Sequence, residues 1–413
     1  MEPSSASFIH LRIMQLVGYT QLYYCPKRQN LVRSNILVVY SIILCMVVIT
    51  WLIYNLVDIE AHWRSLEINS VMETIEYINL IGSGAGYINS IVQSIIHCDK
   101  HLKHFKKTME INKLFKQVLK VYVPWERLRK RLGTVAGGMF LTSFAATAYI
   151  LMIALYMKWY YYIRYWLLYR ILYNFCSLRY FESYMVVSAF KWTFDYLNKC
   201  LQELSFLGGK HMDAYEKKNR KFGLYLTEMN YQKQSHKNSV YFRFKILRNI
   251  YHLQWELSKV FNDIFGLSLL VNIASDFLSF LTLTYWMLTT MTTFSMALVD
   301  VVALFGFLIC LVPHLLNLIL ICRICYLTTQ SVMVMFFQAS RTALFVHKIP
   351  HDPTNESHIM QIEEFSLQLL HQRITFSAFG FFNIDMNLLY TIIGATATYL
   401  IISIQFYLSA QRG

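Results

Sequence analysis

The sequence predicts an all-α membrane protein with seven transmembrane helices, a cytoplasmic N-terminus, an extracellular C-terminus and a cytoplasmic bundle of helices. Two observations lead to this fold class. Hydrophobic residues make up 56% of the 413-residue chain and charged residues only 15%, whereas soluble domains contain about a quarter charged residues. In addition, basic residues are concentrated in alternate connections between long apolar stretches, as expected for loops on one side of a membrane.

Seven apolar stretches are long enough to cross a bilayer, which requires about 20 helical residues. They are 35–57, 70–96, 134–157, 161–189, 264–290, 300–325 and 384–408. The second stretch is the least apolar, because it contains Glu73, Glu76 and the run Gly82-Ser83-Gly84-Ala85-Gly86. Small residues of this kind allow transmembrane helices to pack closely.

The basic residues determine the predicted orientation. The connection 97–132 contains eleven Lys and Arg residues and the connection 190–263 contains thirteen, whereas the connection after the first span contains only Arg64. Since loops rich in Lys and Arg stay in the cytoplasm, the N-terminus is expected inside and the C-terminus outside. This orientation is the reverse of that of a G-protein-coupled receptor. The same loops account for the net charge of +14, so no nucleic-acid partner is expected.

These spans divide the chain into five parts. Residues 1–34 form a cytoplasmic N-terminus, and residues 35–325 contain the first six spans with cytoplasmic helical loops at 97–133 and 190–263. Residues 326–383 form a cytoplasmic loop and an anchor helix. Residues 384–408 form the last span and residues 409–413 an extracellular tail.

Cysteine and glycosylation signals agree with this orientation. Of the eight cysteines, Cys25, Cys98, Cys200 and Cys325 fall in or beside cytoplasmic segments and the others lie within spans, so no external disulfide is expected. The sequon Asn355-Glu356-Ser357 lies on the cytoplasmic side, and we expect it to be unmodified.

Three apolar stripes with helical spacing indicate amphipathic cytoplasmic helices. They are Phe190, Phe194, Leu197, Leu201 and Leu204; Ile250, Leu253, Leu257, Val260 and Ile264; and Ile362, Phe365, Leu369 and Phe376. The first two stripes extend the fourth and fifth spans into the cytoplasm, and the third forms a helix just before the last span. The stripes pack within one subunit or join subunits, and the periodicity alone favours neither.

No enzyme motif is present: the sequence has no Walker loop, no His-Glu-x-x-His and no Gly-x-Ser-x-Gly. The pair Cys322 and Cys325 has no second pair or histidine to complete a metal site, so two buried thiols are expected. His97, His101 and His104 are surrounded by lysines and are interpreted as a solvated basic helix face. We therefore predict neither enzymatic activity, cofactor nor metal.

The last predicted span ends Thr398-Tyr399, five mostly apolar residues, then Gln405-Phe406. Together with the preceding residues, this order resembles the closing region of insect gustatory receptors, relatives of the insect odorant receptors. The preceding residues are Phe365-Ser366-Leu367-Gln368-Leu369-Leu370, Phe376, Gly380-Phe381-Phe382, Ile384-Asp385 and Leu388-Leu389. The specific match covers 365–406, and Thr398, Tyr399, Gln405 and Phe406 are the family motif.

This resemblance implies a homotetrameric or heteromeric ligand-gated cation channel in the plasma membrane of gustatory neurons, on the sensory dendrite. Four copies of the last helix would surround one pore that passes Na⁺, K⁺ and Ca²⁺, and the cytoplasmic helices would anchor the subunits to one another. A small-molecule tastant would bind in the outer half of each subunit. The alternatives are a metabotropic chemoreceptor without a pore of its own, whose Asp/Glu-Arg-Tyr and Asn-Pro-x-x-Tyr motifs are missing, and a transporter, whose internal repeat is missing.

The residues of the last span fit a pore wall. Thr391, Thr398 and Gln405 are seven residues apart and share one helix face, although threonine hydroxyls also bond to their own helix. Ile402 and Phe406 are the candidates for an apolar gate. Asp385 is a charge at the pore mouth or, as we favour, a helix N-cap. Gly394 allows either bending or close packing.

The ligand pocket is expected among aromatic and polar side chains in the outer halves of the second to sixth spans. The candidates are Tyr77, Asn79, Tyr149, Tyr165, Trp166, Tyr169, Thr282, Tyr285, Trp286 and Phe305. Aromatic rings with a few amides and hydroxyls suit a sugar or a flat bitter compound, and the same rings also anchor helices at membrane interfaces. Few carboxylates lie in this region, so a bitter or other apolar tastant is favoured over a sugar.

Overall fold

The computed structural model describes residues 5–25, 30–66, 70–121, 123–156, 158, 160–219, 226–292, 298–347, 364–365 and 367–412. It is mostly helical, which confirms the all-α character of the predicted class. The long helices are α2 (Asn35–Leu66), α3 (Ser70–Ile96), α5 (Trp125–Tyr156), α6 (Tyr160–Asn219), α7 (Leu226–Thr292), α8 (Leu298–His347) and α10 (Met386–Arg412). The shorter elements are α1 (Ser5–Leu16), α4 (Cys98–Lys113), a π-helical turn (Leu114–Val118) and the strands β1 (Leu22–Cys25), β2 (Asn30–Arg33), β3 (Ser377–Ala378) and β4 (Phe382–Asn383).

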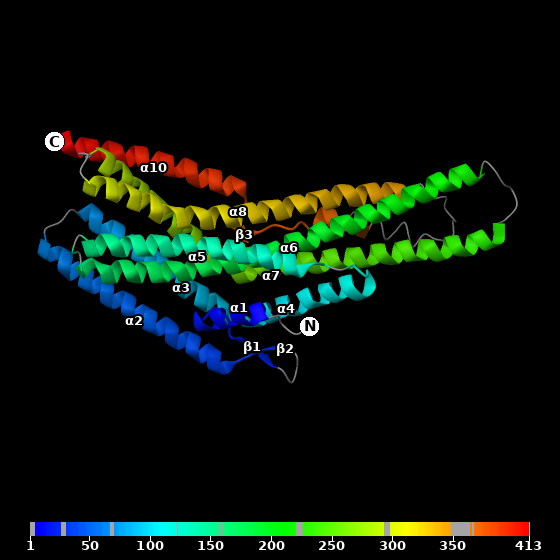
Figure 1. The fold of residues 1–413 in the computed structure, drawn as a ribbon, viewed down its shortest axis with the longest axis horizontal. Helices are drawn as coiled ribbons and strands as arrows, with labels where there is room; N and C mark the ends of the chain where they lie inside the picture. Colours follow the sequence, from blue (N-terminus) through cyan, green and yellow to red (C-terminus); the bar gives the residue numbers. More distant parts are fainter. Residues whose placement is uncertain are drawn as a thin grey trace.

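The long helices lie side by side in one elongated bundle (Figure 1). The carboxyl ends of α2, α5, α7 and α10 lie at the same end of this bundle, and α6 and α7 run past the other helices at the opposite end. Each of the seven predicted spans falls within one long helix to within a few residues. The C-terminal end of α10 therefore lies far from the extensions of α6 and α7.

Four helical segments of the described chain are long and apolar enough to cross a membrane. They are Asn35–Asp58, Trp125–Tyr156, Lys245–Tyr285 and Val301–Phe337, and α10 contributes a shorter apolar segment, Met386–Ile402. The helix α6 is not among these four segments. It carries two arginines that are buried against neighbouring helices, Arg170 and Arg179, which are 1% and 0% exposed. Packing within the bundle thus removes these charges from the lipid-facing surface.

The first two apolar stripes, which were predicted to be cytoplasmic, are packed along the long extensions of α6 and α7. Phe190, Phe194 and Leu201 on α6 and Leu257 on α7 are all buried in one core, which also contains Phe365. This packing occurs within one chain. The side chain of Leu204 and the residue Ile362 lie outside the described part of the chain, as does the sequon at 355–357.

The third stripe does not form a single helix up to Phe376. The helical segment ends at His371, and the chain turns through a two-stranded hairpin of β3 and β4 before α10 begins. Positive φ angles at Phe379 and Gly380 form this turn, for which glycine is well suited. Phe376 is still buried, because it packs edge-on against Phe190. The position of Phe376 fits the helical spacing of the stripe, but the residue leads into a hairpin.

The side chain of Asn262 attaches this hairpin to α7. Its Nδ2 donates to the carbonyl of Thr375 at 2.9 Å, and its Oδ1 accepts from the amide of Ser377 at 3.0 Å. Gly266, one turn further along α7, lies so close to the hairpin that an added Cβ would be 2.9 Å from the Phe379 nitrogen. The segment leading into α10 is therefore firmly held on α7.

The predicted solvated histidine face of α4 is wrong. The ring of His101 contacts Phe265 edge-on with centroids 5.8 Å apart, and the ring of His104 contacts Phe190 in the same way at 6.2 Å. Burial lowers the pKa of His104 to about 4, so the ring is neutral. Lys100 and Lys107 also reach α7, where they pair with Asp263 at 2.7 Å and with Glu256. His101 and His104 thus lie on the side of α4 that packs against α6 and α7.

Candidate functional site

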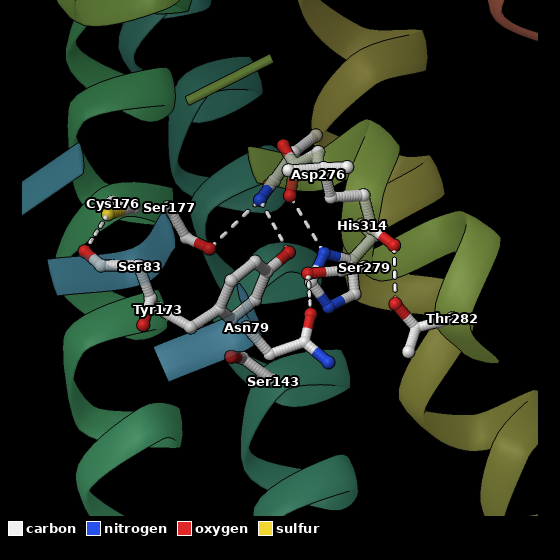
Figure 2. Close-up of polar contacts among 12 residues, drawn as sticks. Asn79, Ser83, Ser143, Tyr173, Cys176, Ser177, Asp276, Ser279, Thr282 and His314 are labelled. Carbon is white, nitrogen blue, oxygen red and sulfur yellow. Dashed lines mark hydrogen bonds and ion pairs between the residues drawn. The ribbon is translucent and has the colours of Figure 1, made fainter. Parts of the chain in front are cut away.

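A buried polar cluster lies in the middle of the bundle, where α3, α6, α7 and α8 meet (Figure 2). We call it the Asp276 cluster. Its members are Asn79, Tyr169, Tyr173, Ser177, Asp276, Ser279, His314 and Asn317. These residues come from four helices that are far apart in the sequence, so the tertiary fold alone brings them together.

Asp276 and His314 form the centre of the cluster. The Nδ1 atom of His314 lies 2.7 Å from Oδ1 of Asp276, and both side chains are almost fully buried within apolar segments of α7 and α8. Because an ionised carboxylate only accepts hydrogen bonds, Nδ1 carries the proton. The other ring nitrogen, Nε2, lies within hydrogen-bond distance of the Tyr169 hydroxyl, at 3.1 Å. A chain of hydrogen bonds thus joins α6 to α8 and α7.

A second set of hydrogen bonds surrounds this chain. The Nδ2 of Asn317 donates both to the Tyr173 hydroxyl and to Ser177 Oγ, each at 2.9 Å. The ring of Tyr173 lies against that of His314, with centroids 4.2 Å apart. Buried polar groups that are satisfied in this way stabilise one arrangement of their helices. The cluster therefore stabilises one position of α6 relative to α8.

Arg170 borders the cluster on the side of α5. Its guanidinium donates to the backbone carbonyl of Ser143 at 3.2 Å and to Thr147 Oγ1 at 3.4 Å, and lies 4.9 Å from the ring centroid of Tyr173. A cation over an aromatic face is stabilised by the ring quadrupole. Arg170 therefore links α5 and α6 next to the cluster.

Two of the predicted ligand-binding residues belong to the cluster, and a third is adjacent to it. Tyr169 bonds to His314, and Asn79 Oδ1 accepts from Ser279 Oγ at 2.8 Å. Thr282 lies beside Ser279 in Figure 2, and its hydroxyl donates to its own helix at Leu278.

The remaining candidates lie apart from the cluster. The hydroxyl of Tyr149 donates to the carbonyl of Val302 at 2.6 Å, and Tyr165 is buried where it bonds to Asp58. Phe305 is 58% exposed, on the outside of the single chain. Three further candidates are partly buried: Tyr77, Trp166 and Tyr285. The side chain of Trp286 lies outside the described part of the chain.

The pore candidates follow one exposed face of α10. Thr391, Thr398 and Gln405 are exposed in the single chain, and Ile402 is 42% exposed. The hydroxyls of Thr391 and Thr398 donate to their own helix, at 2.9 and 3.1 Å, as the alternative interpretation expected. The side chain of Phe406 lies outside the described part of the chain.

The N-terminal end of α10 is well defined. Asp385 Oδ1 accepts from the amides of Asn387 and Leu388 at 2.9 and 3.1 Å, which confirms the N-cap interpretation. A cavity of about 240 Å³ lies beside this cap. Polar groups of Thr329, Asn383 and Asn387 line it, together with Asp385. The beginning of the helix is thus accessible and polar.

Tyr173, Asp276, His314 and Asn317 are not among the site residues predicted from the sequence. A usable signal was present, because Asp276 and His314 are ionisable residues inside predicted spans, and such residues in membranes are usually functional or paired.

The expected buried thiols are confirmed: Cys322 and Cys325 are 0% and 1% exposed. Within the described ranges, no group of three or more His, Cys, Asp or Glu side chains could hold a metal ion.

Comparison with known proteins decides the family. The family model described as 7tm Chemosensory receptor matches residues 8–410, nearly the whole chain. The chain belongs to the insect gustatory receptor family. A Drosophila melanogaster relative of the receptor, named gustatory receptor 2a, is 29% identical over 362 residues, which cover 83% of this chain and 80% of the relative.

Two further similarities concern a shorter segment and the fold. The receptor shares 42% identity over 76 residues with a Drosophila melanogaster protein named gustatory receptor for bitter taste 66a, a match that covers 18% of this chain and 14% of the relative. The solved structure of the olfactory receptor OR5 from Machilis hrabei in complex with eugenol superimposes with a TM-score of 0.59 at 14% identity. It covers 97% of this receptor and 99% of that chain, so the two share a fold.

Proposed function

We propose that this gustatory receptor is a ligand-gated, non-selective cation channel of the sensory plasma membrane. Seven transmembrane helices, α2, α3, α5, α6, α7, α8 and α10, would cross the membrane from a cytoplasmic N-terminus to an extracellular C-terminus. The basic loops and the long extensions of α6 and α7 would then lie inside. Four such subunits, identical or mixed, would place α10 around one pore.

The observation that carries this proposal is the two-sided character of α10. Leu389, Ile392 and Thr396 are 8%, 8% and 3% exposed, so one face packs on the bundle. The opposite face leaves Thr391 and Thr398 uncovered in the single chain. Polar groups on a membrane helix are costly in lipid and favourable beside water, so a water-filled pore is a suitable environment for this face.

A contact between α7 and α10 suggests how ligand binding would open the pore. Phe277 follows Asp276 directly on α7, and its ring contacts that of Tyr399 edge-on, with centroids 6.3 Å apart. A ligand that displaces α7 at the Asp276 cluster would therefore move the residue next to Thr398 in the family motif. Such a displacement needs a ligand that binds the open arrangement more tightly than the closed one.

The ligand would be a small tastant in the outer part of the bundle, near Tyr169 and Asn79. We favour a bitter or other apolar compound over a sugar, because aromatic rings dominate this region and the cluster offers few polar groups that are not already bonded to protein. The similarity to a receptor named for bitter taste supports the same class.

The substitution Gln405→Glu tests the pore. If four copies of Gln405 face the pore, four added carboxylates should raise the permeability of Ca²⁺ relative to Na⁺ severalfold. The measurement is the reversal potential of spontaneous openings of purified protein in planar bilayers, which needs no tastant. The control is Gln202→Glu, an identical charge change at an exposed position on the cytoplasmic part of α6, which should leave the permeability ratio unchanged.

An unchanged ratio in Gln405→Glu would contradict the pore assignment. A protein that never conducts in bilayers, yet signals in cells only when G proteins are active, would favour the alternative of a metabotropic chemoreceptor without its own pore.

A further inference from the structure

Below the Asp276 cluster, toward the inner end of the bundle, several buried polar atoms have no hydrogen-bond partner among the described residues. They are Oδ2 of Asp276, both amide atoms of Asn272, the hydroxyl of Tyr180 and Oγ of Ser268. All four residues are at most 2% exposed. Since unpaired buried polar atoms are rare in folded proteins, a group of them indicates bound water or a bound ion.

These atoms converge on one site between α3, α6 and α7. Asn272 and Asp276 are one turn apart on the same face of α7. The Tyr180 hydroxyl on α6 lies close to the Asp276 carboxylate, but not at a distance and angle that make a hydrogen bond, and Cys176 lies one turn earlier on α6. On the side of α3, a Cβ added to Gly86 would overlap Asn272 Oδ1 and lie 3.0 Å from Cys176 Sγ. The glycine thus brings the α3 backbone close to this site.

Only one oxygen of the Asp276 carboxylate is bonded to a described neighbour. His314 Nδ1 lies 2.7 Å from Oδ1, which is the only ion-pair contact of Asp276 in the described chain, whereas Oδ2 has no hydrogen-bond partner there. The guanidinium of Arg170 on α6 is directed to Ser143 and Thr147 on α5. A buried carboxylate oxygen without a partner is unfavourable, so a cation beside Oδ2 would stabilise the fold.

We propose that Asp276 Oδ2, Asn272 Oδ1 and the Tyr180 hydroxyl bind a monovalent alkali cation, with water completing its coordination. Oxygen donors suit hard cations, and a single carboxylate matches a single positive charge. The ion lies inside each subunit, away from the exposed face of α10, and joins α6 to α7. This site is distinct from the pore and does not depend on the channel proposal.

Thermal unfolding of the purified full-length protein in detergent tests the site. Sodium chloride should raise the melting temperature relative to N-methyl-D-glucamine chloride at equal ionic strength, and the increase should saturate with sodium concentration. Asp276→Asn should abolish this difference. The matched control is Glu182→Gln, which removes a buried carboxylate already paired with Arg179 at 2.6 Å and should retain the sodium effect.

A second variant keeps the test decisive if Asp276→Asn does not fold. Asn272→Ala removes one oxygen donor without changing charge and should raise the half-saturating sodium concentration about tenfold, equivalent to about 1.4 kcal/mol. Equal melting temperatures of the wild-type protein in the two salts would show that the site holds water alone and overturn the proposal. A sodium effect that persists unchanged in Asp276→Asn or Asn272→Ala would overturn it as well.

Discussion

At the scale of single residues, the hydroxyl of Tyr169 connects α6 to the centre of the Asp276 cluster. It is the one predicted ligand-binding side chain that hydrogen-bonds His314 in the described chain. Under the proposed function, the ring would contact an apolar ligand while the hydroxyl holds the imidazole in place. A change at this position is therefore transmitted to Asp276 on α7 through one imidazole.

The substitution Tyr169→Phe removes this hydrogen bond and keeps the ring. Loss of a buried hydrogen bond costs about 1 kcal/mol, so the half-maximal concentration of an activating tastant should change roughly fivefold to tenfold. Currents would be recorded in cells with quinine, caffeine and sucrose applied in turn. Tyr149→Phe is the matched control, because its hydroxyl donates to the carbonyl of Val302 outside the cluster. Equal responses of the two variants would contradict a special role for Tyr169.

At the scale of elements, close contact between α3 and its neighbours depends on glycines. Gly82, Gly84 and Gly86 each face a neighbouring side chain: an added Cβ would be 2.8 Å from Ser275 Oγ at Gly82 and would overlap Leu52 at Gly84. The Gly-Ser-Gly-Ala-Gly run that made this stretch the least apolar span is thus the surface on which helices meet. Backbone proximity replaces apolar side-chain packing there.

Gly86→Ala tests this role of α3. The added methyl overlaps Asn272 and meets Cys176, so α3 must move away from α6 and α7, which should destabilise the protein by about 1–3 kcal/mol. The control is Gly137→Ala on α5, where nothing lies within 4 Å of the added Cβ. This substitution should be neutral or slightly stabilising. Melting temperatures of both purified variants measure the difference, and equal values would contradict the tight α3 packing.

The helices and strands show which features could be predicted from the sequence and which could not. The two stripes on α6 and α7 were predicted because helical periodicity is local, and the cap at Asp385 followed from its position before an apolar run. The hairpin at β3 and β4 was missed, since Phe376 fits a helical spacing and the side chain of Asn262 that holds the hairpin comes from α7. Such a distant partner leaves no local pattern.

At the scale of the whole molecule, a single chain leaves one side of α10 uncovered, including Tyr399 of the family motif. Tyr390, Ile393 and Tyr399 are 65%, 50% and 54% exposed, which suits either lipid or neighbouring subunits. If four subunits form one pore, the purified complex should contain four chains of 48.8 kDa. Mass measurement of the detergent-solubilised complex, with the detergent contribution subtracted, checks this. A monomer that persists after cross-linking in intact membranes would contradict the homotetramer and leave a heteromer as the remaining form of the channel proposal.

The sequence by itself determined the helical membrane class and the approximate positions of the long helices, because apolar length and periodicity are properties of contiguous residues. It also determined the family, through the ordered residues at 365–406 and the match of the family model. Only the tertiary structure decided which polar residues form a site. Asp276, His314, Tyr173 and Asn317 lie on three different helices, and their hydrogen bonds exist only once α6, α7 and α8 pack together. The same packing turned the histidines of α4 toward the core. Contacts between distant segments depend on the geometry of packed helices, which no local pattern encodes.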